Sequence, residues 1–236
     1  MKKLGIAIDG VIRDYLTQFD KQYRKSFIHN ASIVSFSDNF EAEMTTDEEE
    51  EKLAREIEKK VNDRITLPVD TNDLLNHYDF EEGNQLGTDN ILTPKEKLEE
   101  FIHEKYPFQI FGQAEQYGDA MRFVNEIQKF GLDNNLFETV LYSKLKSQSI
   151  SATYFFLSKN ACRIKNVKFL ERDEDPWDLF DVIIDSEPEV FENKKTNDNK
   201  SIKISRPYNQ WNEADYSFDD IKEVYDEKFL NKLFTL

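Results

Sequence analysis

The sequence predicts an α/β protein: a doubly wound parallel sheet of about five strands that carries an inserted, mainly helical cap. Two observations lead to this prediction. Short apolar segments ending in polar residues alternate with amphipathic segments, as in parallel sheets covered on both faces. The alternation stops after the first strand and helix and resumes near residue 119. We therefore expect a core of residues 1–30 and 119–236 and a cap of residues 31–118.

The composition supports one elaborated domain. The chain has 236 residues, of which 39% are hydrophobic and 13% aromatic, and this is enough apolar material for a core. The net charge of −16 opposes direct binding to nucleic acid or to an anionic membrane. No apolar run suits a signal peptide or a membrane span, so we expect synthesis in the cytoplasm. The single cysteine, Cys162, rules out an intrachain disulfide and is expected to pack as a small core residue.

The core elements follow from the spacing of apolar residues. The first strand is expected at Lys3–Ile8, and a helix over Val11–Ile28 follows, with apolar intervals of three and four. Further helices are expected at Met121–Phe130, where Gly131 would be the C-terminal stop, and at Ser147–Ala161. Four more strands are expected at 139–143, 167–170, 181–185 and 202–204, with a helical turn at 176–177 and a closing helix at 218–234.

Two helices are expected in the cap. Thr46 is suited to cap a helix that begins with the acidic run Asp47–Glu51 and ends near Arg64. Thr93-Pro94 is suited to open the second helix, because proline is favoured in the first helical turn.

Polar residues follow three of the expected strands. In doubly wound sheets, ligands bind beyond the carboxyl ends of the strands, where Asp9, Ser143 and Asp185 would lie. Taken singly, each has an ordinary structural explanation: a turn, a helix cap and an Asx turn. Their order and spacing favour a common site.

These segments resemble the haloacid dehalogenase-like (HAD) superfamily, most closely its phage and bacterial nucleotidase-like branch. The matching segments, in chain order, are LGIAIDGVIRD, YPFQIFG, VLYS, SISATYFFLSKNAC, DVIIDSEPEVF and IKISRPYN. The resemblance implies a HAD-like fold in which the first Asp of an Asp-x-Asp motif is the nucleophile and the second is the general acid/base. It places Asp9 in the second role and Ala7 in the first. Alanine has no nucleophilic or metal-binding oxygen, so the covalent route is closed.

The implied site also lacks other acidic residues of the family pattern. Where many members have two adjacent acids in the fourth motif, this chain has Asp185 and Ser186. Any Mg²⁺ would rest weakly on Asp185 and Asp9, with Glu187 or Glu189 as possible compensation, and no other cofactor is expected. For the lysine of the third motif, Lys144, Lys146 and Lys159 are all candidates. The vestigial pocket is taken as Asp9, Ser143, Lys146 and Asp185.

Other motifs are weak. His29, His77 and His103 are too far apart in sequence to indicate a metal site. Trp177 and Trp211 suit either an anchor for a partner or ordinary packing.

The function expected from these residues is non-catalytic. The sharpest expectation is a phage protein that has become a structural or assembly component of the virion, acting through contacts with other proteins in a large viral assembly or a homo-oligomer. One rival is a magnesium-dependent phosphatase or 5′-nucleotidase-like hydrolase, in which Asp9 would activate water. Another is a protein that binds nucleotide or phosphate without turnover.

Overall fold

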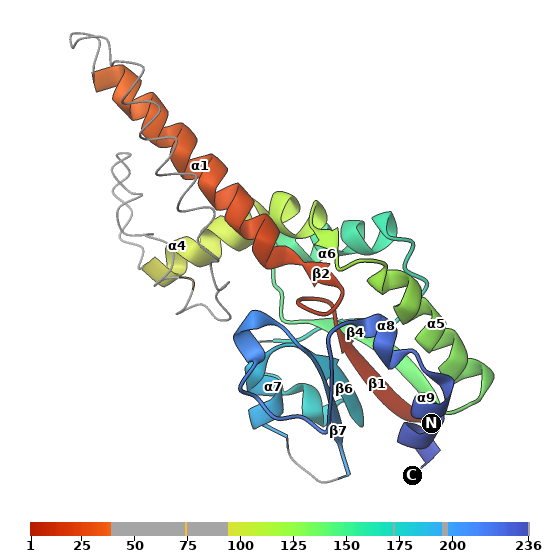
Figure 1. Ribbon diagram of the computed structural model, residues 1–236. Helices are drawn as coiled ribbons and strands as arrows, with labels where there is room; N and C mark the ends of the chain where they lie inside the picture. The colour runs from red at the N-terminus through yellow and green to blue at the C-terminus, as the bar shows by residue number, and fades with distance from the viewer. Residues whose placement is uncertain (39–73, 75–93, 172, 195–197, 236) are drawn as a thin grey trace.

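The structure is a computed structural model that describes residues 1–38, 74, 94–171, 173–194 and 198–235. A six-stranded sheet, parallel throughout, forms its centre (Figure 1). Its strands, in spatial order, are β5 (Val167–Phe169), β4 (Phe137–Ser143), β1 (Lys2–Ala7), β6 (Val182–Asp185), β7 (Lys200–Ile204) and β8 (Tyr216–Phe218). In chain order this is 3-2-1-4-5-6, a doubly wound arrangement. The predicted fold class is confirmed, with six strands rather than about five.

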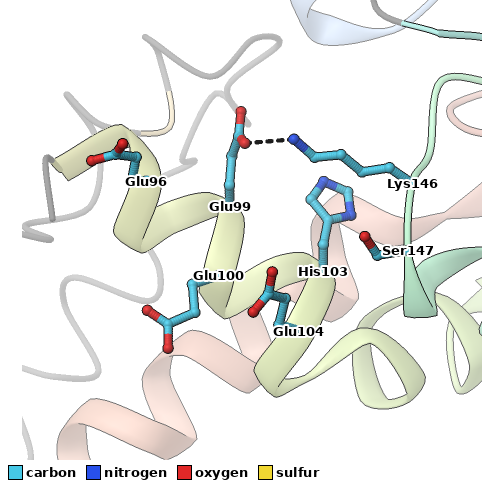
Figure 2. Close-up of a pocket in the computed structure, with 7 residues that line it drawn as sticks. All are labelled: Glu96, Glu99, Glu100, His103, Glu104, Lys146 and Ser147. Carbon is cyan, nitrogen blue, oxygen red and sulfur yellow. Dashed lines mark hydrogen bonds and ion pairs between the residues drawn. The ribbon is translucent and has the colours of Figure 1, made fainter.

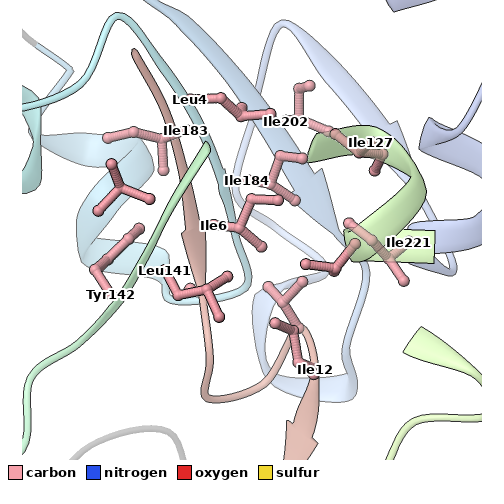
Figure 3. Close-up of a cluster of buried hydrophobic side chains, with 14 of the residues drawn as sticks. Leu4, Ile6, Ile12, Ile127, Leu141, Tyr142, Ile183, Ile184, Ile202 and Ile221 are labelled. Atoms are coloured by element: carbon pink, nitrogen blue, oxygen red, sulfur yellow. The ribbon is translucent and has the colours of Figure 1, made fainter. Parts of the chain in front are cut away.

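Helices cover both faces of the sheet (Figure 1). The larger ones are α5 (Ala120–Asp133), α6 (Gln148–Lys159), α7 (Pro188–Glu192) and α9 (Glu227–Thr235), with α8 (Ile221–Val224) as a single turn. In Figure 3, Ile127 of α5 and Ile221 of α8 lie on one side of β1, whereas Tyr142 and Ile183 lie on the other. The two layers bury one continuous apolar core.

The first helix differs from its prediction at both ends. It is α1 (Tyr15–Asp38), not Val11–Ile28. The chain first turns at Gly10, whose φ is +74°, and the short strand β2 (Arg13–Asp14) then pairs with β3 (Glu115–Gln116). Helix α1 extends away from the sheet and runs through the expected start of the cap at residue 31 (Figure 1).

The described part of the expected cap packs against α1. Helix α4 (Pro94–Glu100) opens at the expected proline and continues into two π-helical turns, η2 (Phe101–Lys105) and η3 (Phe108–Gly112). Their apolar residues form a second core cluster with Leu16 and Phe19 of α1. The helix expected from Asp47 to Arg64, with its acidic run and its cap Thr46, lies outside the described residues, and the cap boundaries stay a prediction.

Two predicted helix ends are wrong for identifiable reasons. Gly131 lies inside α5 rather than at its stop, and a Cβ there would approach the Phe137 ring to 2.5 Å, so the glycine serves close packing. The single closing helix is instead β8, α8 and α9. Asp220 caps α8, and the carboxylate of Asp226 accepts a hydrogen bond from the amide of Phe229 near the start of α9.

Two 3-10 turns complete the described elements: η4 (Pro176–Asp178), at the predicted helical turn, and η5 (Pro207–Asn209). No helix among the described residues is both long and apolar enough to cross a membrane.

Candidate functional site

The fold brings three of the predicted site residues to one edge of the sheet. Asp9 follows β1, Ser143 ends β4 and Asp185 ends β6, and β1 lies between the other two strands. This is the point where the strand order reverses, which is where ligands bind in doubly wound sheets. The three residues therefore lie at the same end of the sheet, and their sharing a functional site stays a prediction.

Asp9 is held on both of its oxygens. Oδ1 accepts a hydrogen bond from Arg13 Nε at 2.9 Å, and Arg13 Nη2 lies 2.8 Å from the same oxygen. Oδ2 accepts a hydrogen bond from the hydroxyl of Ser143. Ser143 is thus not directed toward a ligand, and Asp9 has no oxygen free of a protein partner.

Arg13 is a buried cation whose neighbours explain why it tolerates burial. Its side chain is fully buried, and Nη1 donates to Thr153 Oγ1 at 2.9 Å and to the Phe111 carbonyl at 3.2 Å. The guanidinium also lies over the rings of Phe111 and Phe156. Burial lowers the pKa of Arg13, and the charge of Asp9 opposes that shift. Removing Asp9 would leave this cation without its counterion.

A second hydrogen bond crosses β1 above Ala7. Ala7 is paired in register with Tyr142, and the adjacent Ile6 is paired with Ile184, which places Ala7 between Tyr142 and Asp185 on one face of the sheet. The phenol of Tyr142 spans this position and donates to Asp185 Oδ2. Because strands lie about 4.8 Å apart, the tyrosine must pass over β1 to reach the far strand. An alanine at position 7 leaves it the room.

Asp185 is also held on both oxygens. Its Oδ1 accepts from the amides of Ser186 at 2.6 Å and Glu187 at 2.9 Å. Burial raises the pKa of Asp185 to about 6, against the effect of these donors, which favour the charged form. Burial, together with the charge of Asp185, raises the pKa of the half-buried Glu187 to about 8.

Side chains from the segment after β6 and from the loop after β7 surround the turn at Gly10. At Gly10, a Cβ would come within 1.9 Å of Ser186 Oγ and 2.7 Å of Tyr208 Oη. These two hydroxyls are hydrogen-bonded to each other at 3.0 Å. Arg206 Nε donates to the Gly10 carbonyl at 2.7 Å, and its guanidinium lies 3.9 Å from the centre of the Tyr117 ring. Protein side chains thus occupy the space nearest the turn.

The three candidate lysines take different partners. Lys146 Nζ donates to Glu99 Oε2 at 2.6 Å, and Lys159 Nζ lies 3.5 Å from the Ala114 carbonyl. Lys144 lies 3.4 Å from Glu189, and its charge lowers the pKa of Asp185. Of the three, Lys144 is the one whose charge acts on the strand-end carboxylate.

Lys146 instead lines an open hollow of about 260 Å³ (Figure 2). The other residues lining it are Glu96, Glu99, Glu100, His103, Glu104 and Ser147. Burial lowers the pKa of His103 to about 4, and its Nδ1 lies 2.7 Å from Ser149 Oγ. The lining includes none of Asp9, Ser143 and Asp185, so the hollow is separate from the strand-end residues.

The strand-end residues do not fit a magnesium ion. Mg²⁺ requires several hard oxygens in near-octahedral array. Ala7 supplies none, and the oxygens of Asp9 and Asp185 are already accepting hydrogen bonds. Glu189, one of the two candidate compensating acids, pairs with Lys144. Among the described residues, no three His, Cys, Asp or Glu side chains gather as metal ligands.

The two tryptophans and the single cysteine lie in different environments. Trp177 is buried, and its Nε1 donates to the Val190 carbonyl at 2.7 Å, whereas Trp211 is 92% exposed. Cys162 is half-buried and packs against the main core. His77 lies outside the described residues.

Sequence reasoning missed the two residues that organise the site. Arg13 stood in the first motif but gave no sign of being buried, since arginine is mostly exposed. Tyr142 precedes the serine of the second motif in a strand of apolar residues, so the sequence indicates only an ordinary core residue there. A tyrosine one residue before Ser143, set beside an alanine at position 7, is the pattern that could have revealed the bridge.

Comparisons with known proteins add little to this geometry. No family model and no curated protein matches the chain. A solved structure described as "Crystal Structure analysis of a Dehalogenase with intermediate complex" is similar over 95% of this chain and 96% of that chain, at 10% sequence identity and a TM-score of 0.49. The fold assignment therefore rests on the strand order of the chain itself.

Proposed function

We propose that this protein is a catalytically inactive member of the HAD-like fold that works through contacts with other proteins. The observation that carries the proposal is the hydrogen bond from Tyr142 to Asp185, which crosses the nucleophile position at Ala7. With Asp9 held by Arg13 and Ser143, each acid that a phosphatase of this kind would use is engaged in the fold. Function follows from the site rather than from the fold, and this site favours structure over turnover.

The experiment is hydrolysis of p-nitrophenyl phosphate and of nucleoside monophosphates with magnesium. The wild-type protein is expected to match the buffer background. Asp185→Asn tests any turnover that is seen, because it removes the acid while keeping its shape, and Asp133→Asn on the exposed face of α5 is the matched control. Turnover that survives in Asp133→Asn but disappears in Asp185→Asn would sink the proposal in favour of an atypical phosphatase.

The finer proposal is a role in a virion or its assembly. It is supported by the HAD nucleotidase-like motifs together with the alanine at position 7, a pairing that fits retention of the fold for its shape. Sizing the protein in its native extract is the measurement. We expect it in a large particle, and a monomer both in the extract and when purified would remove the structural role.

A further inference from the structure

One stretch of the sequence is basic, although the chain as a whole is acidic. Residues 139–170 contain six Lys or Arg and no Asp or Glu, although the whole chain has a net charge of −16. Two of these cations, Lys144 and Lys146, are paired with glutamates. The other four are exposed, and none of them forms an ion pair with a described residue. They are Lys159, Arg163, Lys165 and Lys168, and we call them the basic edge.

The basic edge borders exposed aromatic side chains. Lys168 lies on β5, the last strand at one side of the sheet, and Lys159 ends α6. On α6, Tyr154 is 51% and Phe155 46% exposed. The Tyr154 ring packs against Phe169 of β5 with centroids 5.5 Å apart. Exposed aromatic rings beside unpaired cations are typical of a surface that binds a partner.

The opposite side of the sheet carries the opposite charge. Strand β8 is the last strand there, and residues 213–227 around it contain seven Asp or Glu and one Lys. Asp215 pairs with Lys194. No ion pair with a described residue engages the remaining six, Glu213, Asp219, Asp220, Glu223, Asp226 and Glu227, which we call the acidic edge.

The two edges cannot neutralise each other within one molecule. Five strand spacings separate β5 from β8, which is roughly 24 Å along the sheet. This is several times the distance over which charges interact in physiological salt, about 8 Å. The two edges therefore do not neutralise each other in the monomer, and another molecule can supply a complementary surface to each.

We propose that the basic edge of one copy of this chain binds the acidic edge of another copy, so that the protein associates head to tail. A second copy is the occupant favoured by the structure, because each chain presents both complementary surfaces. Since the two edges differ, the contact is heterologous and generates a ring or an open filament rather than a two-fold dimer. This inference rests on the proposed function and names the protein partner in it, which is a second copy of the chain.

The experiment is sedimentation velocity over a range of protein concentrations, at about 25 mM and about 500 mM salt. We expect concentration-dependent assembly at low salt and its loss at high salt, because exposed charge pairs are screened. Reversal of the basic edge in Arg163→Glu/Lys165→Glu/Lys168→Glu is expected to weaken assembly by at least about tenfold. Reversal of the acidic edge in Glu213→Lys/Glu223→Lys/Glu227→Lys is expected to do the same.

Mixing the two reversed variants provides the decisive test. Each variant then has two edges of like charge and stays monomeric alone, whereas the mixture has complementary edges and should assemble. The control is Lys21→Glu/Lys25→Glu/Lys129→Glu, which changes the net charge as much as the basic-edge variant but alters exposed lysines of α1 and α5. Because both of its edges are unchanged, the control should assemble when it is alone, at least as well as the mixture of the two reversed variants.

Three outcomes would overturn the inference. The wild-type protein could stay monomeric at low salt, or both reversed variants could assemble as well as the wild type. The third outcome is a monomer whose basic edge binds single-stranded oligonucleotide, which would assign the surface to nucleic acid instead. Failure here is distinct from failure of the proposed function, because the hydrolysis assay is read on the protein whether or not it assembles.

Discussion

The carboxyl ends of the strands and the two edges of the sheet use charge in opposite ways. At the strand ends, Asp9, Arg13 and Asp185 each form hydrogen bonds with other groups of the same chain. At the edges, the exposed cations and carboxylates form no ion pair with a described residue, although Asp220 and Asp226 accept hydrogen bonds from backbone amides and Lys159 lies near the Ala114 carbonyl. The difference indicates that the charged groups at the strand ends belong to the folded core, whereas the charges that are free of ion pairs lie at the two edges of the sheet.

The largest effect is expected from breaking the buried ion pair. Asp9→Asn leaves the Arg13 guanidinium buried without a counterion, and this should lower the free energy of unfolding by about 3–5 kcal/mol. Denaturant unfolding measures it. The double variant Asp9→Asn/Arg13→Met should recover part of the loss, because no buried charge remains. A loss below about 1 kcal/mol in the single variant would show that the pair contributes little.

The next largest effect is expected at Ala7. Ala7→Asp inserts a carboxylate beneath the Tyr142 phenol and beside Asp185, so we expect a loss of about 1–3 kcal/mol from crowding and desolvation, and no phosphatase activity. Ala7→Ser, a smaller and uncharged change, should lose less. If Ala7→Asp is fully stable and hydrolyses p-nitrophenyl phosphate, the Tyr142 bridge does not block the position.

An effect of comparable size is expected in the pH dependence of stability. The pKa of Asp185 is about 6 in the folded protein against 3.8 for an ordinary Asp, so the folded state binds its proton more tightly than the unfolded state. The stability that this group contributes is present in full below about pH 4 and is lost as the pH rises to about 6, by at most about 1.4 kcal/mol per unit.

The measurement compares unfolding of the wild type and Asp185→Asn between pH 4 and 6. The variant should gain stability relative to the wild type as the pH rises, while Asp133→Asn should run parallel to the wild type. Glu187 should continue this loss of stability up to about pH 8, since its pKa in the folded protein is about 8. Parallel curves for the wild type and Asp185→Asn would place the pKa of Asp185 near its ordinary value.

The smallest stability effect is expected at the edges. Both edge-reversal variants should unfold as monomers within about 1 kcal/mol of the wild type at high salt, because exposed substitutions outside the core contribute little. The acidic-edge variant should lose more of the two, because Glu223 accepts a hydrogen bond from the Asp219 amide and Glu227 begins α9. A large loss would mean that these charges hold the fold and would remove the contrast between the two regions.

Much of the sheet could be predicted from sequence, because buried parallel strands are nearly continuous apolar runs, as in β4 and β6. Strand β8 could not: its polar Ser217 and flanking acids gave no apolar run, and Phe218 fitted a helical stripe. The strand-end location of Asp9, Ser143 and Asp185 followed from the order of the motifs. Their partners did not, since Arg13 and Tyr142 reach the site through packing that has no local signature. For the same reason, the spacing did not separate Lys144 from Lys146.

The most direct test of the account is the thermal stability of the wild-type protein in millimolar magnesium, phosphate and nucleoside monophosphate. A ligand that binds only the folded state raises stability by RT ln(1+[L]/Kd). Because Asp9 and Asp185 are engaged with Arg13, Ser143 and Tyr142, we predict no change in the melting temperature with any of the three. A rise that is retained in Asp133→Asn and abolished in Asp185→Asn would contradict the account, because it would mean that the strand ends still hold a ligand.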